Sequence, residues 1–253
     1  KEYRRQLGFN NQSSAKDYLA AKDIIPDIDY KYIDSLNKRI SDIIRKINGT
    51  IHHSSRRNDN DILQFYGKYI PNTYDIIKNS NIIPRLTNQG RRPEEVLFSW
   101  LRGFFVCEYF TPSIAKIFNI KLDSISRIGD DDLKNVETFR RSPTADLSIA
   151  INSQRTRIEV QSGFQGINDV KEHKVREARR IYKEMNEPTI CIHYDLFNGQ
   201  VAFVRLDSIA ENDVHFVTRQ QMEGQSVFSI DQNHFKWRLL HEVPHFEDLD
   251  IEL

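Results

Sequence analysis

Residues 144–163, TADLSIAINSQRTRIEVQSG, decide the fold that we predict for this chain. Apolar and polar residues alternate on both sides of a polar turn, which predicts two short antiparallel strands. Side chains in a strand point alternately to its two faces, so Leu147, Ile149 and Ile151 share an apolar face. Ile158 and Val160 do the same in the second strand. Each strand therefore has one face for a core and one polar face.

The polar faces carry two acids, Asp146 and Glu159. A four-residue loop would set Asp146 against Gln161 and Ser148 against Glu159. A two-residue loop, 152–153, would set Asp146 directly against Glu159. The acids are direct or diagonal neighbours in both registers. A slip by one residue would send them to opposite faces and would bury polar groups.

Two adjacent carboxylates repel each other unless a cation lies between them. Mg²⁺ prefers oxygen and takes one or two carboxylates together with waters and a phosphate. A bound metal ion lowers the pKa of a water molecule and polarises the phosphorus centre. The pair therefore favours hydrolysis of a phosphodiester, and the alternative interpretation is a surface hairpin with scattered charges.

The two strands also carry a recognisable motif. An Asp followed on the next strand by E-x-K marks the PD-(D/E)xK nucleases, and Asp146 with Glu159-Val160-Gln161 resembles that motif. Ala145 precedes the Asp, and Gln161 stands at the lysine position, as it does in some restriction endonucleases of this superfamily. The resemblance implies that Asp146, Glu159 and the Val160 carbonyl bind Mg²⁺, and that Gln161 orients the attacking water or the phosphate.

The flanking sequence has the order of elements that the resemblance implies. The core of that superfamily is a helix, a strand, the two motif strands, a second helix and a further strand. The matching segments here are a buried helix over 93–110, a charged amphipathic helix over 168–185, and strands over 189–197 and 200–206 around an Asn-Gly turn. We therefore predict an α/β (mixed α+β) fold with a restriction-endonuclease-like core, in which helices flank a mixed central sheet.

For the first ninety residues we predict a mainly helical extension that makes dimer or DNA contacts. Residues 31–47 form a clean amphipathic pattern, which indicates a packing or dimer helix. The expected division is 1–90 for this region and 91–253 for the catalytic core, with one integrated domain as the alternative.

The charge distribution points to a polyanionic partner. The chain has a net charge of zero, but residues 134–183 hold eleven Lys or Arg and six Asp or Glu, a balance of +5. The candidate DNA contacts are Lys171, Lys174, Arg140, Arg141, Asn88, Gln89, Arg91 and Arg92. The two lysines could replace the missing motif cation at the scissile phosphate, or they lie on an ordinary solvated helix face. The side chains of the loop 86–92 have donors and acceptors suited to base edges.

Two further features have competing interpretations. Glu95 is a candidate auxiliary acid of the metal site, because a helical Glu often joins that site in this superfamily; the alternative is a first-turn acid that stabilises the helix dipole. His241-Glu242-Val243-Pro244-His245 matches the H-E-x-x-H zinc protease pattern. Pro244 opposes the helix that this pattern requires, so we do not expect a zinc site there.

The composition indicates a folded protein of the bacterial cytoplasm. No run of about twenty apolar residues predicts a membrane span, and Cys107 and Cys191 are expected to be buried free thiols. The leading hypothesis is a type II restriction endonuclease that cuts double-stranded DNA as a homodimer, with a cognate DNA methyltransferase in the host. The alternatives are a structure-selective repair or recombination nuclease of the same fold, and a non-catalytic DNA-binding protein with a decayed site.

Overall fold

The computed structural model describes residues 2–19, 24–86, 91–129, 144–219 and 224–252. The α-helices are α1 (Glu2–Leu7), α2 (Gln12–Leu19), α3 (Tyr30–Thr50), α4 (Asp59–Gln64), α5 (Ile70–Asn79), α6 (Pro93–Ile117) and α7 (Glu172–Met185), with a π-helical turn, Phe65–Tyr69, between α4 and α5. The strands are β1 (Ser126–Arg127), β2 (Leu147–Ile151), β3 (Gln154–Gly163), β4 (Asp169–Lys171), β5 (Thr189–Asp195), β6 (Gln200–Arg205), β7 (Phe216–Arg219), β8 (Gln225–Ser229) and β9 (Phe235–Arg238).

The described strands form a central mixed sheet and a smaller second sheet. The central sheet has the order β1-β2-β3-β5-β6-β9, and the small sheet has the order β4-β8-β7. β3 and β5 are parallel, whereas the other neighbouring pairs of the central sheet are antiparallel. Parallel neighbours need a long crossover, and α7 lies within the one between β3 and β5. The predicted mixed central sheet flanked by helices is confirmed.

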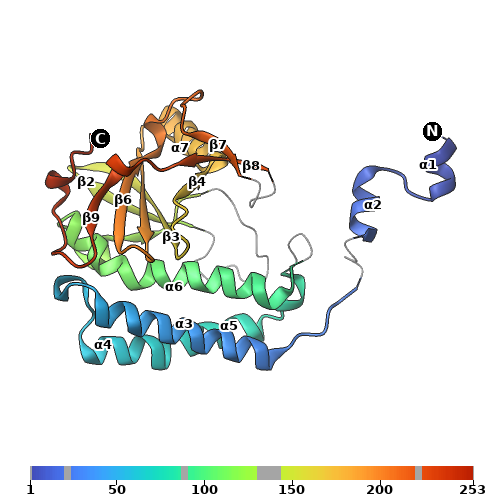
Figure 1. The fold of residues 1–253 in the computed structure, drawn as a ribbon, viewed down its shortest axis with the longest axis horizontal. Helices are drawn as coiled ribbons and strands as arrows, with labels where there is room; N and C mark the ends of the chain where they lie inside the picture. The colour runs from blue at the N-terminus through green and yellow to red at the C-terminus, as the bar shows by residue number, and fades with distance from the viewer. Residues whose placement is uncertain (1, 20–23, 87–90, 130–143, 220–223, 253) are drawn as a thin grey trace.

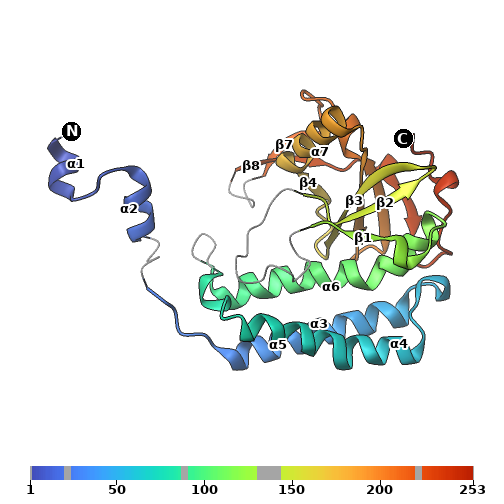
Figure 2. The same ribbon diagram turned by 180° about the vertical axis from the view of Figure 1, so that it is seen from behind.

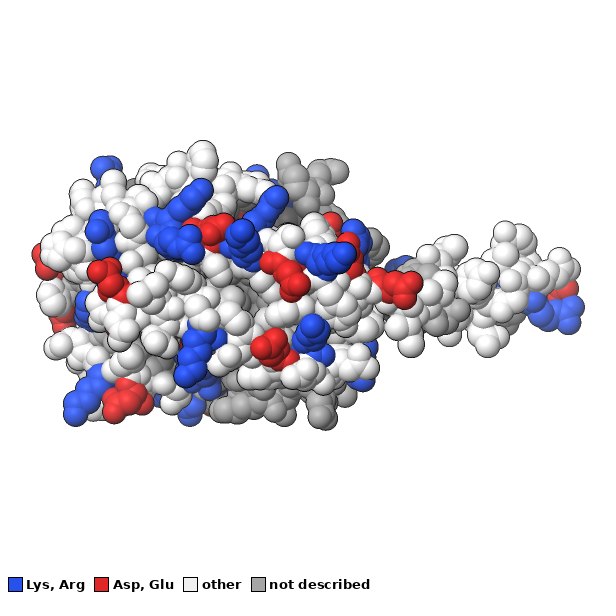
Figure 3. All heavy atoms as spheres, turned by 90° about the horizontal axis from the view of Figure 1, so that it is seen from below, with Lys and Arg blue, Asp and Glu red and all other residues white. Residues whose placement is uncertain are grey.

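Helices cover both faces of the central sheet in layers (Figures 1 and 2). α6 crosses one face, and α3, α4 and α5 form a further layer beneath α6. α7 lies on the opposite side of the sheet, next to β4, β7 and β8. The outer surface of the lower helix layer has interspersed basic and acidic side chains (Figure 3). This visible face is therefore not a continuous basic surface.

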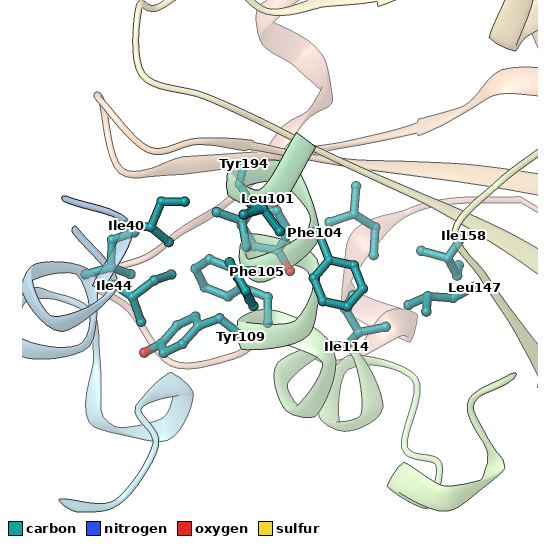
Figure 4. Packing of buried hydrophobic residues seen from close by; sticks show 14 of the residues in the cluster. Ile40, Ile44, Leu101, Phe104, Phe105, Tyr109, Ile114, Leu147, Ile158 and Tyr194 are labelled. Carbon is teal, nitrogen blue, oxygen red and sulfur yellow. The ribbon is translucent and has the colours of Figure 1, made fainter. Parts of the chain in front are cut away.

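A single apolar cluster runs from α3 through α6 to the sheet (Figure 4). The predicted amphipathic helix over 31–47 is confirmed as α3, which buries Ile40 and Ile44 in this cluster. On the sheet side, Phe110 of α6 stacks on Tyr194 of β5 with 4.1 Å between ring centroids. Both rings are fully buried, so this contact fastens α6 to the middle of the sheet.

The first predicted helix, 93–110, is seven residues too short, because α6 continues to Ile117. It does so through Pro112, which cannot donate to the carbonyl of Glu108 four residues earlier. The Arg57 guanidinium donates to that carbonyl instead, at 2.7 Å. A side chain from another segment thus provides the hydrogen bond that the proline removes.

Two other predicted boundaries were wrong. Residues 169–171 form β4 and not the start of the charged helix. Val170 is buried in β4, where it pairs with Phe228 of β8. α7 consequently begins at Glu172. β5 ends at Asp195, because a turn over 196–199 joins it to β6.

The N-terminal segment extends away from the rest of the molecule (Figure 1). α1 and α2 contain no buried residue, and Tyr18 and Ile25 are exposed. The chain joins the body at Asp29, whose backbone N–H donates to the Glu94 carboxylate at 2.9 Å. Across the described residues, no helix has the length and apolar character needed to cross a membrane.

Candidate active site

The turn between β2 and β3 decides how the two acids face each other. Asn152 and Ser153 both have left-handed backbone angles, with φ of 49° and 69°, which is typical of a two-residue type I′ hairpin turn. The pairing runs from Ile151 opposite Gln154 to Leu147 opposite Ile158. One further residue in the same register places Asp146 opposite Glu159. The structure thus has the two-residue alternative of the two predicted registers.

Asp146 lies one residue before β2 and binds the neighbouring strand through its side chain. Its Oδ2 accepts a hydrogen bond from the backbone N–H of Val160 at 2.6 Å. The N–H and C=O of one strand residue point to the same side of the strand. The Val160 carbonyl is therefore directed toward the edge where the Asp146 carboxylate lies.

Backbone groups also hold Asp146 from the side of β1. The Asp146 carbonyl accepts hydrogen bonds from the N–H groups of Ile128, at 3.0 Å, and Gly129, at 3.2 Å. A Cβ atom on Gly129 would lie 3.2 Å from the Asp146 Cα. Only glycine allows this approach without displacement of one of the two backbones.

Glu159 is 4% exposed and has a cationic partner. Its Oε2 accepts a hydrogen bond from Nζ of Lys174 at 2.9 Å, and its Oε1 accepts one from Nε2 of Gln161 at 3.3 Å. The Lys174 ammonium also donates to the carbonyl of Thr144 at 3.2 Å. A buried carboxylate is costly unless it is paired, so Lys174 stabilises the charged form of Glu159.

Two cysteines lie close enough to Asp146 and Glu159 for the negative charges of these acids to raise the pKa of their thiols. Burial raises the pKa of Cys191 well above its usual value, and the negative charges of Glu159 and Asp146 raise it further. Burial, Asp146, Glu108 and Glu159 likewise raise the pKa of Cys107 on α6. Both cysteines are free, as predicted, although Cys107 is only half-buried. They stay protonated at neutral pH and do not act as nucleophiles.

The donor set suits a hard divalent cation. Asp146, Glu159 and the Val160 carbonyl offer oxygen ligands only, and Mg²⁺ completes such a set with water and substrate phosphate. Over the ranges that the structure describes, no three His, Cys, Asp or Glu side chains gather into a metal site.

The structure brings some of the predicted residues to the site and places others elsewhere. Gln161 and Lys174 contact Glu159, and Lys171 ends β4 at the start of α7. Arg91 donates to the Ser99 hydroxyl at 2.7 Å, and Arg92 pairs with Glu94 at 3.1 Å, both at the start of α6. The predicted contacts Asn88, Gln89, Arg140 and Arg141 lie outside the described residues.

The auxiliary acid that we predicted on α6 lies away from the pair. Glu95 is twelve residues before Cys107, a separation of about 18 Å along the helix axis. Glu108 follows Cys107 directly and is nearer to the site, but its Oε1 accepts from Nε of Arg127 at 2.6 Å and its Oε2 from the Tyr69 hydroxyl at 2.9 Å. Its carboxylate is thus engaged by other side chains.

One polar residue next to the site was not predicted from the sequence. His193 of β5 is the register partner of Gln161 and is 3% exposed. It lies in a strand of mainly apolar residues, where no motif marks it. The H-E-x-x-H segment at 241–245, by contrast, is not helical, and its Val243 N–H donates to the Ser54 hydroxyl. The expected absence of the zinc protease helix is confirmed.

Comparisons with known proteins give weak structural likenesses. No protein-family model matches this chain, and no curated protein matches it. Hjc, a Holliday junction resolvase from the archaeal hyperthermophile Archaeoglobus fulgidus, superposes with a TM-score of 0.29 and 11% sequence identity. The match covers 44% of this chain and 71% of the resolvase chain.

Proposed function

We propose that this protein is a Mg²⁺-dependent nuclease that hydrolyses phosphodiester bonds in double-stranded DNA. The observation that carries the proposal is the placement of Asp146 opposite Glu159 on neighbouring strands, with the Asp146 carboxylate bonded to the Val160 N–H. This arrangement brings carboxylate oxygens and a backbone carbonyl together at the start of β2, beside β3. Those are the ligands that a hard cation needs beside a phosphate.

Each residue of the site has a distinct role in this proposal. Asp146, Glu159 and the Val160 carbonyl hold the ion, which when bound lowers the pKa of a water molecule and offsets the charge that develops on the phosphate. Lys174 supplies the positive charge that the lysine of the motif would carry. It reaches Glu159 from α7 rather than from β3, where Gln161 stands. Gln161 has no charge and orients the water or a phosphate oxygen.

The presence of Lys174 favours an active site over a decayed one. A motif that had lost its cation would leave Glu159 buried without a positive neighbour, at a cost in stability. Here the ammonium of Lys174 lies 2.9 Å from the Glu159 carboxylate. The charge balance of the motif is therefore retained although its lysine position holds Gln161.

We propose fewer DNA contacts from α7 than its basic composition indicates. Arg176 pairs with Glu172, and Arg180 pairs with Glu177 and Glu184, within the same helix. Intrahelical pairs of this kind stabilise a solvated helix face. We therefore retain as proposed contacts to phosphates or bases Lys171, Arg91, Arg92, Asn88, Gln89, Arg140 and Arg141.

The most specific form of the proposal is a type II restriction endonuclease of a bacterial cytoplasm. Such an enzyme would act as a homodimer on a palindromic site, because the two-fold symmetry of the protein would match that of the DNA. A cognate DNA methyltransferase would protect the host. Glu95, which was predicted as an auxiliary acid of the metal site, lies in the first turn of α6, and this proposal gives it the alternative role of an acid that stabilises the helix dipole.

The deciding experiment is incubation of the full chain with phage DNA and a supercoiled plasmid in the presence of Mg²⁺. Asp146→Asn and Glu159→Gln should each abolish cleavage and keep DNA binding, whereas Lys171→Gln should weaken binding without loss of the chemical step. Full cleavage by either acid variant would refute the site.

The cleavage pattern separates the alternatives. Discrete fragments from phage DNA support sequence-specific restriction. Cuts confined to a four-way junction or another branched substrate support a structure-selective nuclease instead. Binding without cleavage in both Mg²⁺ and Mn²⁺ would indicate a non-catalytic DNA-binding protein.

A further inference from the structure

Glu108 of α6 is a buried acid whose carboxylate accepts three hydrogen bonds. Its exposed fraction is 8%. Oε1 accepts from Nε of Arg127 at 2.6 Å, and Oε2 accepts from Nη2 of Arg127 and from the Tyr69 hydroxyl, the latter at 2.9 Å. The two parallel bonds to Arg127 form a fork, which fixes the plane of the guanidinium as well as its distance. Glu108 therefore holds Arg127 in one orientation.

Arg127 carries this constraint to β1. In the antiparallel register Arg127 is opposite Leu147 of β2, so the two side chains lie on the same face of the sheet. Leu147 is buried in the apolar cluster that includes α6, and the Arg127 side chain accordingly meets α6 on this face. β1 is only two residues long, lies at the edge of the central sheet and is exposed. A strand this short makes few ladder hydrogen bonds, so its position depends on the Arg127 side chain.

The two residues after Arg127 clamp Asp146. Ile128 and Gly129 donate their backbone N–H groups to the Asp146 carbonyl at 3.0 and 3.2 Å. Oδ2 of Asp146 in turn accepts from the Val160 N–H at 2.6 Å. A continuous path of covalent and hydrogen bonds thus runs from α6 through β1 to the acid beside β3. A movement of β1 would displace the Asp146 backbone, and the carboxylate with it.

Glu108 itself has a rigid support. The Arg57 guanidinium donates to its carbonyl at 2.7 Å, and two residues later Phe110 stacks on Tyr194 of the central sheet. Tyr69 is the last residue of the π-helical turn, a type of element that often occurs at functional sites. Burial and the charge of Glu108 raise the pKa of Tyr69, so its hydroxyl stays protonated and donates to the carboxylate. Glu108 is thus fixed through both its backbone and its side chain.

We infer that Glu108 is a positioning residue of the candidate active site, which holds β1 through Arg127 and so keeps the Asp146 carboxylate where an ion can bind it. This inference rests on the proposed nuclease function. It gives α6 an acid that serves the site through protein contacts rather than as a metal ligand. Arg127 is a positioning residue of the same kind, and lysine cannot replace it, because an ammonium has no planar pair of donors.

Arg127→Lys tests the fork without a loss of charge. We expect kcat for cleavage in Mg²⁺ to fall roughly tenfold or more, because the Asp146 carboxylate is displaced, and KM for DNA to stay unchanged. Glu108→Gln should cause a similar loss. The double variant should lose no more than either single variant, because both substitutions act through the same pair. Unchanged kcat in Arg127→Lys would overturn the inference, and so would a raised KM at constant kcat, which would indicate that Arg127 contacts DNA instead.

Arg219 provides the matched control. It forms a fork of the same kind in the small sheet, where its Nε and Nη2 bind the Asp169 carboxylate at 2.8 and 3.1 Å. The exposed fractions of the side chains are also similar, 43% and 9% for Arg127 and Glu108 against 38% and 3% for Arg219 and Asp169. Arg219→Lys should lower Tm about as much as Arg127→Lys does and should leave kcat unchanged. Equal losses of kcat in both variants would indicate a general effect of stability and contradict the positioning role.

The amide proton of Val160 gives a readout that does not depend on cleavage. Its short hydrogen bond to the Asp146 carboxylate shifts its resonance downfield, and Arg127→Lys should move the resonance upfield as the carboxylate withdraws. Tyr69→Phe removes one donor and keeps the fork, so it should give a smaller shift in the same direction, and it takes the place of Arg127→Lys if that variant does not fold.

The same resonance separates failure of the inference from failure of the proposed function. A wild-type Val160 resonance in Arg127→Lys, or in Tyr69→Phe where it takes that place, would refute the positioning role even in an active enzyme. A shifted resonance, in a protein whose wild-type form cleaves no DNA, would support the positioning role and reject the proposed nuclease function.

Discussion

At the scale of single residues, Asp146 owes its position to the backbone of Gly129. A methyl group at residue 129 would lie 3.2 Å from the Asp146 Cα, closer than most Cβ contacts, so one of the two backbones must move. We expect Gly129→Ala to lower kcat roughly tenfold, because small displacements of catalytic groups are costly, and to change Tm little.

Gly103 of α6 provides the matched control for Gly129. A Cβ there would meet nothing within 4 Å. Gly103→Ala should therefore leave cleavage unchanged and raise the free energy of unfolding by about 0.5–1 kcal/mol. Steady-state cleavage assays and urea denaturation measure both effects. Wild-type kcat in Gly129→Ala would show that Asp146 does not depend on this contact.

A second prediction at the residue scale concerns the ion pair between Lys174 and Glu159. Lys174→Met keeps the aliphatic stem but leaves the buried carboxylate without its ammonium, and should lower the free energy of unfolding by about 2 kcal/mol. Glu159→Gln in the same protein should recover part of this loss, because the uncompensated charge is then gone. Urea denaturation of the four proteins gives the coupling energy, and strictly additive changes would argue against a stabilising pair.

At the scale of elements, the β2–β3 hairpin sets the register on which the site depends. Ser153 has φ of 69°, a conformation that favours glycine. Ser153→Gly should raise the free energy of unfolding by about 0.5 kcal/mol and leave cleavage intact, since Asn-Gly is the preferred pair for this turn.

The same substitution inside a helix should have the opposite sign. Ser35 lies in α3 with its hydroxyl bonded to the Lys31 carbonyl, and Ser35→Gly should lower the free energy of unfolding by about 0.5 kcal/mol. Thermal or urea denaturation distinguishes the two signs. A destabilising Ser153→Gly would contradict the left-handed turn and the register that follows from it.

At the scale of the whole molecule, the first two helices stand apart from the common core. No residue of α1 or α2 is buried. Deletion of residues 1–23 should therefore change the free energy of unfolding by no more than about 0.5 kcal/mol. Thermal denaturation at several protein concentrations tests this expectation. A concentration-dependent loss of Tm would instead indicate that the segment packs on a second copy of the chain.

The amino-acid sequence alone was sufficient to predict β2, β3, β5 and β6, the apolar faces of the β2–β3 hairpin, and the placement of Asp146 and Glu159 on one face of it. Strand periodicity is a local property, so the alternation over residues 144–163 determines which side chains share a face. The same holds for α3, whose apolar stripe follows the helical period. The position of Asp146 and Glu159 on one face of a hairpin was predictable for this reason.

Only the tertiary structure decided what surrounds that pair. Loops of two and four residues both place the apolar side chains of the hairpin on the same face. The sequence therefore could not distinguish the two registers, and the backbone angles of Asn152 and Ser153 decide between them. Residues 169–171 suit a helix locally and become a strand only by pairing with β8. Lys174 reaches Glu159, and His193 reaches Asn168, because the crossover through α7 lays distant segments on the same face of the sheet. No local pattern encodes these contacts, since they depend on how separate elements pack.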